Sequence, residues 1–459
     1  MLRAIKPHLA RLARTLMIAL LLTLAARPAA AQQALRDSET EQLFNDISRP
    51  LVQAAGRDPA SVNIVLLNDP EINAFVSTGQ NVYLQSGLLD AADDVGQIQG
   101  VIAHELGHVN QGVSIKMAEG SRQATGMTIA TMILGALAIA AGAGDAGMGI
   151  IAAGQQVAMG QFLAFTRSQE SSADQAGAKY LSTSGISGKG LLAFFGKLQN
   201  QEYRLAIYSK DSYERTHPLS SERVQALEHK LRADAAWDAP PDPQLNARFL
   251  RVKAKLSGFS NPRQATTKYP ESDQSVPGHY ARAYAYHVSG YPDKALAEAD
   301  ALLATAPKDP FFLELKGQIL LEGGKPAEAI APLREATELS RNSPLIASML
   351  GHALVETGTS ANFAEAKQVL KTAVNRDNQN PFAWYQLGVI YDREGDLARA
   401  ALATAERSNL EDKPKLALAS AERAMKGIPS GSPDWLRAQD IAMVSRTELK
   451  KKNRKDRTE

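Results

Sequence analysis

The sequence predicts a mainly α-helical protein in two parts, an α+β domain with a small sheet followed by an α-solenoid of paired helices. Three observations carry this prediction. Short strand-like apolar runs lie between residues 62 and 85, and a stretch with helical spacing precedes them. A second stretch with helical spacing begins at Asp93. Beyond residue 276 the chain repeats itself about every 34 residues.

The composition excludes several classes of protein. With 44% hydrophobic and 22% charged residues among 459, the chain has enough apolar mass for two or three folded domains. It contains no cysteine, which excludes disulfides, thiolate metal sites and a cysteine nucleophile, so a transition-metal site must use histidine and carboxylate. Outside the first 31 residues, 46 basic residues stand against 49 acidic ones, and a nucleic-acid partner is not expected.

Residues 1–31 have the three-part pattern of a secretory signal peptide. Four basic residues precede an apolar run from Leu16 to Ala26, and small residues end at Ala31. Eleven apolar residues are too few to cross a hydrocarbon core of about 30 Å. We therefore expect cleavage after Ala31 and a mature protein that works outside the cytoplasm.

The elements that follow can be predicted in order. Residues 37–57 predict a helix with one apolar face. Residues 62–67, 73–77 and 81–85 predict three strands, which we expect to form a small antiparallel sheet beside the helices. A helix should then run from Asp93 or Asp94, as its N-cap, to about Gly112.

Residues 126–144 form a stretch of 19 residues that is rich in Ala, Gly, Ile and Leu and uncharged. The stretch is long enough to span a membrane, although small residues dilute its hydropathy. We expect instead a buried or membrane-touching helical hairpin that continues to Phe165, with small residues that allow close helix packing. A peripheral membrane contact through 126–165 follows from this interpretation, and a span across the inner membrane is the alternative.

Prolines gather between residues 239 and 275, which predicts a linker between the two parts. Beyond it, Gly317, Gly351 and Gly388 each follow a proline by seven residues. This pattern resembles the tetratricopeptide repeat, with repeats starting near residues 276, 310, 344 and 381 and a weaker helical pair from Lys413. We expect a repeat domain over 276–445 that docks a protein partner on its concave face, then a solvated, disordered basic tail over 446–459.

The chemistry is concentrated in the segment His104-Glu105-Leu106-Gly107-His108. On a helix, His104 and His108 lie on one face, one turn apart, so two imidazoles can bind a single Zn²⁺ ion. Glu105 points away from that face but stays close enough to take a proton from water activated by the metal. The alternative is a coincidental match on a surface helix.

A catalytic zinc site needs a third protein ligand, and Glu170 is the best candidate. Glu170 and Asp174 are four residues apart and face the same way on a helix. Asp174 could then accept a hydrogen bond from the far ring nitrogen of His104 and fix its tautomer. The alternative is an exposed acidic pair on a solvated helix. Ser114 stands where a three-histidine site would need its third histidine.

These segments together resemble the gluzincin peptidases related to HtpX and the Ste-type prenyl-protein proteases. The resemblance extends to Asn73, Ala74 and Phe75, which match the strand that borders the cleft, and to Thr216-His217-Pro218 with Arg223. It implies a zincin-like metalloprotease domain over 32–238 with one Zn²⁺ ion per chain. His104, His108 and Glu170 would be the zinc ligands and Glu105 the catalytic residue.

With its signal peptide and tetratricopeptide repeats, the chain most resembles the periplasmic proteases of the beta-barrel assembly-enhancing (BepA-like) type. That resemblance implies a periplasmic location and a role in outer-membrane protein assembly and quality control, with the assembly machinery as the partner of the repeats. His217 has three interpretations: it could help to place Arg223 near the oxyanion, reach the open metal position and block water, or be a structural loop histidine.

Two functions follow as hypotheses. The first is an exported zinc endopeptidase that binds extended substrates along the strand at Asn73–Ser77 and cleaves unfolded or misassembled envelope proteins. The second is a non-proteolytic chaperone or assembly scaffold that acts through the repeats. The presence of Glu105 favours the first, since a purely structural metal site needs no base.

Overall fold

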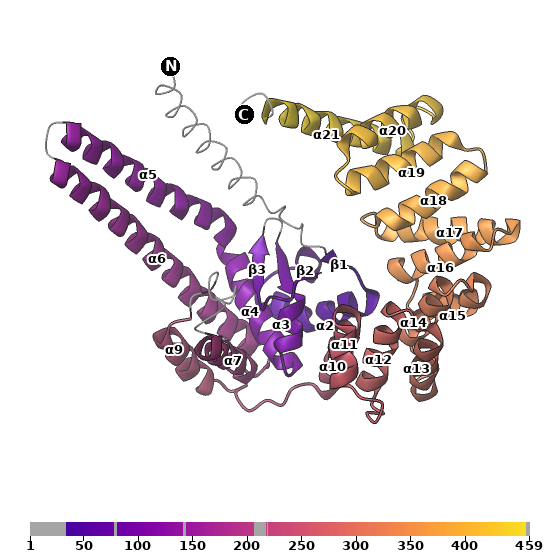
Figure 1. Cartoon of the computed structure of the whole chain (residues 1–459), viewed down its shortest axis with the longest axis horizontal. Coiled ribbons are helices and arrows are strands. Elements are labelled where there is room, and N and C mark those ends of the chain that lie inside the picture. Colours follow the sequence, from indigo (N-terminus) through magenta and orange to yellow (C-terminus); the bar gives the residue numbers. More distant parts are fainter. Residues whose placement is uncertain (1–33, 78–79, 141–143, 206–216, 218, 456–459) are drawn as a thin grey trace, which may run out of the picture.

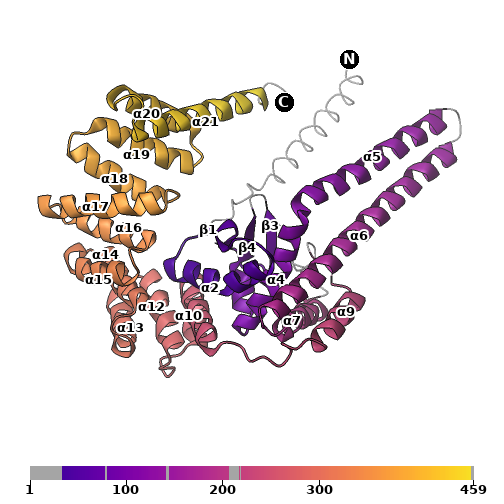
Figure 2. The same cartoon turned by 180° about the vertical axis from the view of Figure 1, so that it is seen from behind.

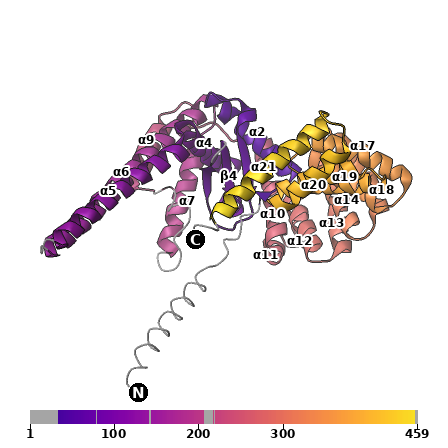
Figure 3. The same ribbon diagram turned by 90° about the horizontal axis from the view of Figure 1, so that it is seen from above.

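The computed structural model describes residues 34–77, 80–140, 144–205, 217 and 219–455. The predicted signal peptide, with its cleavage after Ala31, lies outside these residues. A central domain with a small sheet has a long helical hairpin on one side and a curved array of helix pairs on the other (Figure 1). The hairpin extends away from the rest of the molecule in all three views (Figures 2 and 3).

The sheet has the strand order β1-β2-β4-β3. Its strands are β1 (Ala34–Leu35), β2 (Asn63–Leu67), β3 (Ala74–Ser77) and β4 (Asn81–Gln85). β1 pairs with β2 and β3 with β4 in antiparallel fashion, but β2 and β4 are parallel. The expectation of an antiparallel sheet is therefore wrong for the central pair, because β4 inserts between β2 and β3. β3 is consequently an edge strand.

One hydrophobic core joins the sheet to the helices of the central domain. These helices include α2 (Ser38–Ala54), α3 (Ser86–Ala91), α4 (Val95–Gln111), α7 (Lys189–Leu205) and α9 (Ser221–Arg232), whereas the 3-10 helix Pro59–Ser61 before β2 has no buried residue. The side chains of Asp37 and Asp94 cap the N-termini of α2 and α4 by accepting hydrogen bonds from backbone amides. Helix α4, which carries the histidine motif, lies within this core and is buried from Val95 through Val109 except at Gly96.

The segment predicted as a linker, 239–275, is helical and is not a linker. It forms α10 (Pro243–Ser260) and α11 (Pro262–Lys268), and each helix has a proline in its first turn. Proline suits this position because the first amides of a helix have no intrahelical acceptor. Phe249 and Val252 of α10 belong to the core of the central domain, so α10 packs as part of that domain.

The predicted hairpin is present and is longer than expected. It consists of α5 (Val113–Ala140) and α6 (Gly144–Thr183). Its outer part is not buried: Leu134, Leu137 and Met159 are 57%, 62% and 59% exposed. Among the described residues one helical stretch, Asp145–Thr183, is long and apolar enough to cross a membrane, and 11% of its most apolar window is buried.

The repeats follow the predicted register closely. Their helices are α12 (Val276–Val288), α13 (Pro292–Thr305), α14 (Pro310–Glu322), α15 (Pro326–Leu339), α16 (Pro344–Glu356), α17 (Ser360–Arg376), α18 (Pro381–Arg393), α19 (Leu397–Leu410), α20 (Pro414–Gly427) and α21 (Pro433–Lys455). A Cβ atom on Gly317 or Gly351 would lie 2.4 or 2.5 Å from a leucine of the second helix of its pair, so glycine permits the close contact. α21 includes residues 446–455, so this part of the tail is helical and not disordered as expected; residues 456–459 lie outside the described residues.

Candidate metal centre

Helix α4 places the three polar side chains of the histidine motif in the core of the central domain. His104 and His108 are one helical turn apart, and Glu105 lies beside them. His104 and Glu105 are fully buried and His108 is 3% exposed. Buried polar side chains of this kind require partners, and α6 supplies them to the two histidines.

Two glycines let α6 approach α4 closely. A Cβ atom on Gly107 would lie 2.8 Å from the backbone oxygen of Ala173, and one on Gly177 would lie 3.1 Å from the backbone of Ala103. The short distance between the helices brings Glu170 and Asp174 of α6 against the two histidines. Gly107, inside the histidine motif, thus has a packing role that the spacing of the histidines alone does not reveal.

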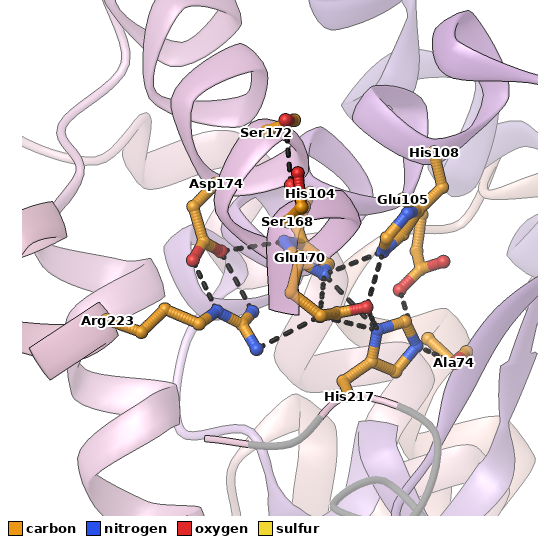
Figure 4. Close-up of polar contacts among 10 residues, drawn as sticks. All are labelled: Ala74, His104, Glu105, His108, Ser168, Glu170, Ser172, Asp174, His217 and Arg223. Atoms are coloured by element: carbon orange, nitrogen blue, oxygen red, sulfur yellow. Dashed lines mark hydrogen bonds and ion pairs between the residues drawn. The ribbon is translucent and has the colours of Figure 1, made fainter. Parts of the chain in front are cut away.

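Nitrogen and oxygen atoms from three elements converge at one point (Figure 4). His104 Nε2 lies 3.1 Å from His108 Nε2 and 3.5 Å from Glu170 Oε2. Glu170 Oε1 lies 3.3 Å from His108 Nε2. One ligand atom from each of His104, His108, Glu170 and His217 lies within 4.8 Å of the others. We call these four residues the metal cluster.

His217 reaches the metal cluster from the segment before α9. Its Nδ1 atom lies 3.3 Å from His104 Nε2 and 3.2 Å from both carboxylate oxygens of Glu170. Its Nε2 atom lies 3.2 Å from the carbonyl oxygen of Ala74 on edge strand β3. His217 therefore lies between the other three residues of the metal cluster and the strand. Thr216 and Pro218, its neighbours in the motif, lie outside the described residues.

Arg223 and Asp174 flank the metal cluster on the side away from Glu105 (Figure 4). Asp174 Oδ1 lies 3.0 Å from His104 Nδ1. Arg223 contacts both Asp174 oxygens, and its Nη1 lies 3.0 Å from Glu170 Oε2. The guanidinium group thus holds the two carboxylates in place. Nothing in these contacts directs Arg223 toward an oxyanion.

The charges of the cluster are strongly coupled. Burial alone would raise the pKa of Glu170 and Asp174, but the histidines around Glu170, and His104 with Arg223 beside Asp174, lower both. Burial alone would lower the pKa of His104, yet hydrogen bonds with Asp174 and Glu170 raise it to about 9. Burial lowers the pKa of His108. The carboxylates are therefore ionised at neutral pH, the form in which they bind a cation.

The residues fit a divalent metal ion. Two imidazoles and a carboxylate are the donor set that zinc takes in catalytic sites, and a further position must stay open. Two ring nitrogens that face each other at 3.1 Å need a proton or a cation between them. Both carboxylate oxygens of Glu105 are buried without a hydrogen bond to the described residues. The arrangement can therefore hold one ion with a carboxylate beside it.

The other predicted residues lie at the border of the site. Ala74 and Phe75 belong to β3, and Asn73 precedes it. Phe195 of α7, which sequence reasoning missed, stacks edge-on against His104 with ring centroids 6.1 Å apart and lies under the guanidinium of Arg223. The adjacent aromatic residues Phe194 and Phe195 were the available signal.

Comparisons with known proteins agree with this geometry. The family model of "Peptidase family M48" matches residues 36–231, and that of the "Tetratricopeptide repeat" matches residues 280–344 and 349–412. The chain is 28% identical over 408 residues to the Beta-barrel assembly-enhancing protease of Escherichia coli (strain K12), covering 85% of this chain and 80% of that protein. It is 30% identical over 204 residues to Metalloprotease LoiP of the same strain, covering 43% of this chain and 73% of that protein. Among solved structures, YrrB, a TPR protein, matches 39% of this chain and 94% of its own at 19% identity and a TM-score of 0.31.

Proposed function

The chain belongs to peptidase family M48, and from this premise we propose that it is an exported zinc endopeptidase that hydrolyses peptide bonds of unfolded or misassembled envelope proteins. That it is a metalloprotease with tetratricopeptide repeats follows from its family and relatives. The observation that carries the finer proposal is the convergence of His104, His108 and Glu170 around one point, with Glu105 beside them.

In the proposed mechanism His104, His108 and Glu170 hold the metal ion. A bound zinc ion would polarise the scissile carbonyl group and make the attacking water more acidic. Asp174 Oδ1 lies 3.0 Å from His104 Nδ1, and by pairing with that nitrogen it would keep Nε2 free to bind the ion. Arg223 acts as a positioning residue, because it holds Asp174 and Glu170 through charge-assisted hydrogen bonds.

Glu105 is the proposed general base. Its two carboxylate oxygens are buried and make no hydrogen bond with the described residues, although His217 Nε2 lies 3.5 Å from Oε1. A carboxylate without such partners can take a proton from the attacking water and pass it to the leaving amine. The substrate backbone would pair with edge strand β3, which would place a scissile bond beside the metal cluster for many different sequences.

The test compares the full mature chain with its Glu105→Gln variant on an unfolded, fluorescently labelled casein. The proposal expects the variant to bind one metal ion and to cleave about 10²–10⁴-fold more slowly, because the proton acceptor is lost. Equal cleavage by both proteins would show that a contaminant is responsible. Cleavage by neither, with metal bound, would favour the alternative of a non-proteolytic chaperone or assembly scaffold.

His217 is proposed to hold the site closed at rest. In the structure it occupies the space between Ala74 of β3 and Glu170, where a substrate chain would have to lie. We expect His217→Ala to leave the metal content intact and to increase cleavage of unfolded casein. An unchanged rate would remove His217 from the mechanism, and a lower rate would indicate that it helps to bind the substrate.

The proposed location is the periplasm, with a role in outer-membrane protein assembly. The pattern of residues 1–31 and the assembly-enhancing protease that matches most of the chain support this proposal. Tetratricopeptide arrays expose a concave surface that docks polypeptides, and this array would dock a protein of the assembly machinery. Pull-down of the mature chain with outer-membrane extracts, with and without residues 276–455, would test that docking.

We also propose that the outer part of the α5–α6 hairpin rests against a membrane. Between Arg122 and Arg167 the sequence has one charged residue, Asp145, and large apolar side chains such as Ile133 and Leu137 are more than half exposed. Flotation with vesicles of phosphatidylethanolamine and phosphatidylglycerol should recover the mature chain. The double variant Leu137→Gln, Met159→Gln should stay unbound, whereas Leu416→Gln, at an exposed position in the repeats, should still float. Equal flotation of all three would contradict the proposal.

A further inference from the structure

A cavity of about 500 Å³ lies where the repeat array meets the central domain. The central domain contributes residues of β1, β2, the start of α2 and α10, and the repeats contribute the first helices of four successive pairs, α12, α14, α16 and α18. Two contacts close the junction beside it, Arg36 Nη2 to Asp377 Oδ2 at 2.8 Å and Ser38 Oγ to Ser343 Oγ at 2.7 Å. Both parts of the molecule thus build this cavity.

A cluster of buried charges lies beside the cavity, and Asp37 and Lys255 of this cluster line it. Lys255 of α10 contacts Asp37 and Glu39, and Arg251 contacts Glu39 and, at 2.6 Å, Asp309. Tyr280 donates a hydrogen bond of 2.6 Å to Glu39. With Glu314 of α14, these residues form what we call the junction cluster: Asp37, Glu39, Arg251, Lys255, Asp309 and Glu314. It contains two cations and four carboxyl groups, so it lacks positive charge.

Glu314 is the member of the junction cluster that no cation satisfies directly. It lines the cavity and is 7% exposed, yet it forms no hydrogen bond or ion pair with the residues that the structure describes. Lys255 is close enough to act on Glu314, but Lys255 is already bound to Asp37 and Glu39. A buried carboxyl group without a partner is destabilising, and a cation supplied by a ligand would relieve that cost.

The rest of the lining suits a polypeptide. The apolar side chains include Leu321, Met349 and Phe382, and Phe382 is 42% exposed. Gln318 lies among them; its amide nitrogen donates to Glu322, and its amide oxygen can accept a hydrogen bond from a peptide backbone. The lining comes from the first helices of four successive pairs, so the site is elongated along the array and can accommodate an extended chain.

We propose that this cavity binds a polypeptide segment in which a lysine or arginine side chain pairs with Glu314 and a neighbouring apolar side chain packs against Leu321, Met349 and Phe382. The site is separate from the metal cluster. Leu66 of β2 lines the cavity, whereas Ala74 of β3 contacts His217, and β4 lies between them, so two strand spacings of about 5 Å intervene. Binding here does not require proteolysis, so the proposal stands independently of the function proposed above.

Fluorescence anisotropy with the full mature chain would test this proposal. The probe is the peptide Gly-Ser-Leu-Lys-Leu-Ser-Gly-amide with fluorescein on its N-terminal amine, and its companion carries norleucine in place of lysine. Both are measured in the Glu105→Gln background, which prevents cleavage during the measurement. The lysine peptide should bind at least about tenfold more tightly than its companion, as expected for one buried charge pair.

The matched variants separate a ligand-binding role from a structural one. Glu314→Gln should abolish the preference for lysine and raise the melting temperature of the free protein, because it removes an unsatisfied carboxyl group. Glu322→Gln should keep the preference, since Glu322 lines the same cavity but is paired with His287 at 3.0 Å. The proposal is overturned if the lysine peptide shows no saturable binding up to about 1 mM, if Glu314→Gln keeps the preference, or if Glu314→Gln lowers the melting temperature.

Discussion

Two buried clusters of polar and charged side chains lie at opposite edges of the same small sheet. In each cluster, the groups that can bind a cation outnumber the positive charges that the protein supplies to them. In the metal cluster the donor atoms of His104, His108 and Glu170 converge within 4.8 Å, which leaves room for a single ion. In the junction cluster Glu314 borders an open cavity of about 500 Å³ with apolar walls. The same lack of positive charge therefore indicates different ligands, a metal ion in one place and a basic side chain in the other.

The largest expected effect comes from removing the charge of a donor in the metal cluster. Glu170→Gln should lower the rate of peptide hydrolysis by about 10³-fold or more, because the bound ion contributes several kcal/mol to transition-state stabilisation. Rates on unfolded casein would measure this. Glu228→Gln, in an exposed pair with Arg232 on α9, should be indistinguishable from wild type. Equal rates for Glu170→Gln and wild type would remove Glu170 from the site.

The next effect concerns the approach of the two helices that build the metal cluster. Gly107→Ala would place a Cβ atom 2.8 Å from the backbone of Ala173, so α4 and α6 must separate. We expect a loss of about 1–3 kcal/mol in the free energy of unfolding, measured in urea, together with weaker metal binding. The control is Gly196→Ala in α7, where a Cβ atom meets nothing within 4 Å and alanine should stabilise the helix by about 0.5–1 kcal/mol. Full stability and metal affinity in Gly107→Ala would contradict the packing argument.

Glu314 of the junction cluster should make the free energy of unfolding depend on pH. The sign of this dependence should be opposite to that of an ordinary carboxylate. Burial raises the pKa of Glu314 to about 8, and Asp37 and Glu39 add to the rise while Lys255 opposes it. Because the folded-state pKa exceeds the unfolded value of 4.5, the stability that Glu314 contributes is fully present below pH 4.5 and is lost as the pH rises through 8.

Relative to Glu314→Gln, the free energy of unfolding of wild type should therefore fall by up to about 1.4 kcal/mol per pH unit between pH 4.5 and 8. Above this range it should fall no further. Urea denaturation of both proteins between pH 5 and 9 (a range of about four units that brackets the transition) would measure the difference. A difference that shrinks as the pH rises would show that the carboxyl group has a cation partner in solution.

The smallest effect belongs to a charge pair that is already satisfied and partly exposed. Arg36 and Asp377 connect the two parts of the molecule, with side chains 39% and 16% exposed. Asp377→Asn should cost about 1 kcal/mol or less in the free energy of unfolding, since Arg36 also keeps Glu41 as a partner. A double-mutant cycle of the two positions would measure it, and a coupling of several kcal/mol would mean that this pair rather than the packing of α10 holds the junction.

The sequence predicted most of the helices and named His104, His108, Glu170 and His217, whose side chains lie together in the structure. The spacing of His104 and His108 and that of Glu170 and Asp174 are helical, so the relation within each pair follows from local geometry. The repeats were predicted in register for the same reason, because each unit contacts mainly its neighbours. The contact between α4 and α6 needed the resemblance to a known family.

Other features depend on contacts between residues far apart in the sequence and could not be predicted. The insertion of β4 between β2 and β3 leaves no mark on the apolar pattern of each strand. Pro243 and Pro262 were interpreted as signs of a linker, but each begins a helix. Glu314 becomes unusual only because α10 and the start of α2 bury it. The one visible signal was a single carboxylate inside the apolar sequence of α14.

The most direct test of the account is the metal content of the purified mature chain, measured by inductively coupled plasma mass spectrometry beside the Glu170→Gln and Glu314→Gln variants. We expect one zinc ion per chain in wild type and in Glu314→Gln, and a large loss of zinc in Glu170→Gln. A wild-type chain without stoichiometric metal, or a Glu170→Gln variant that keeps its metal, would contradict the assignment of His104, His108 and Glu170 as the ligands.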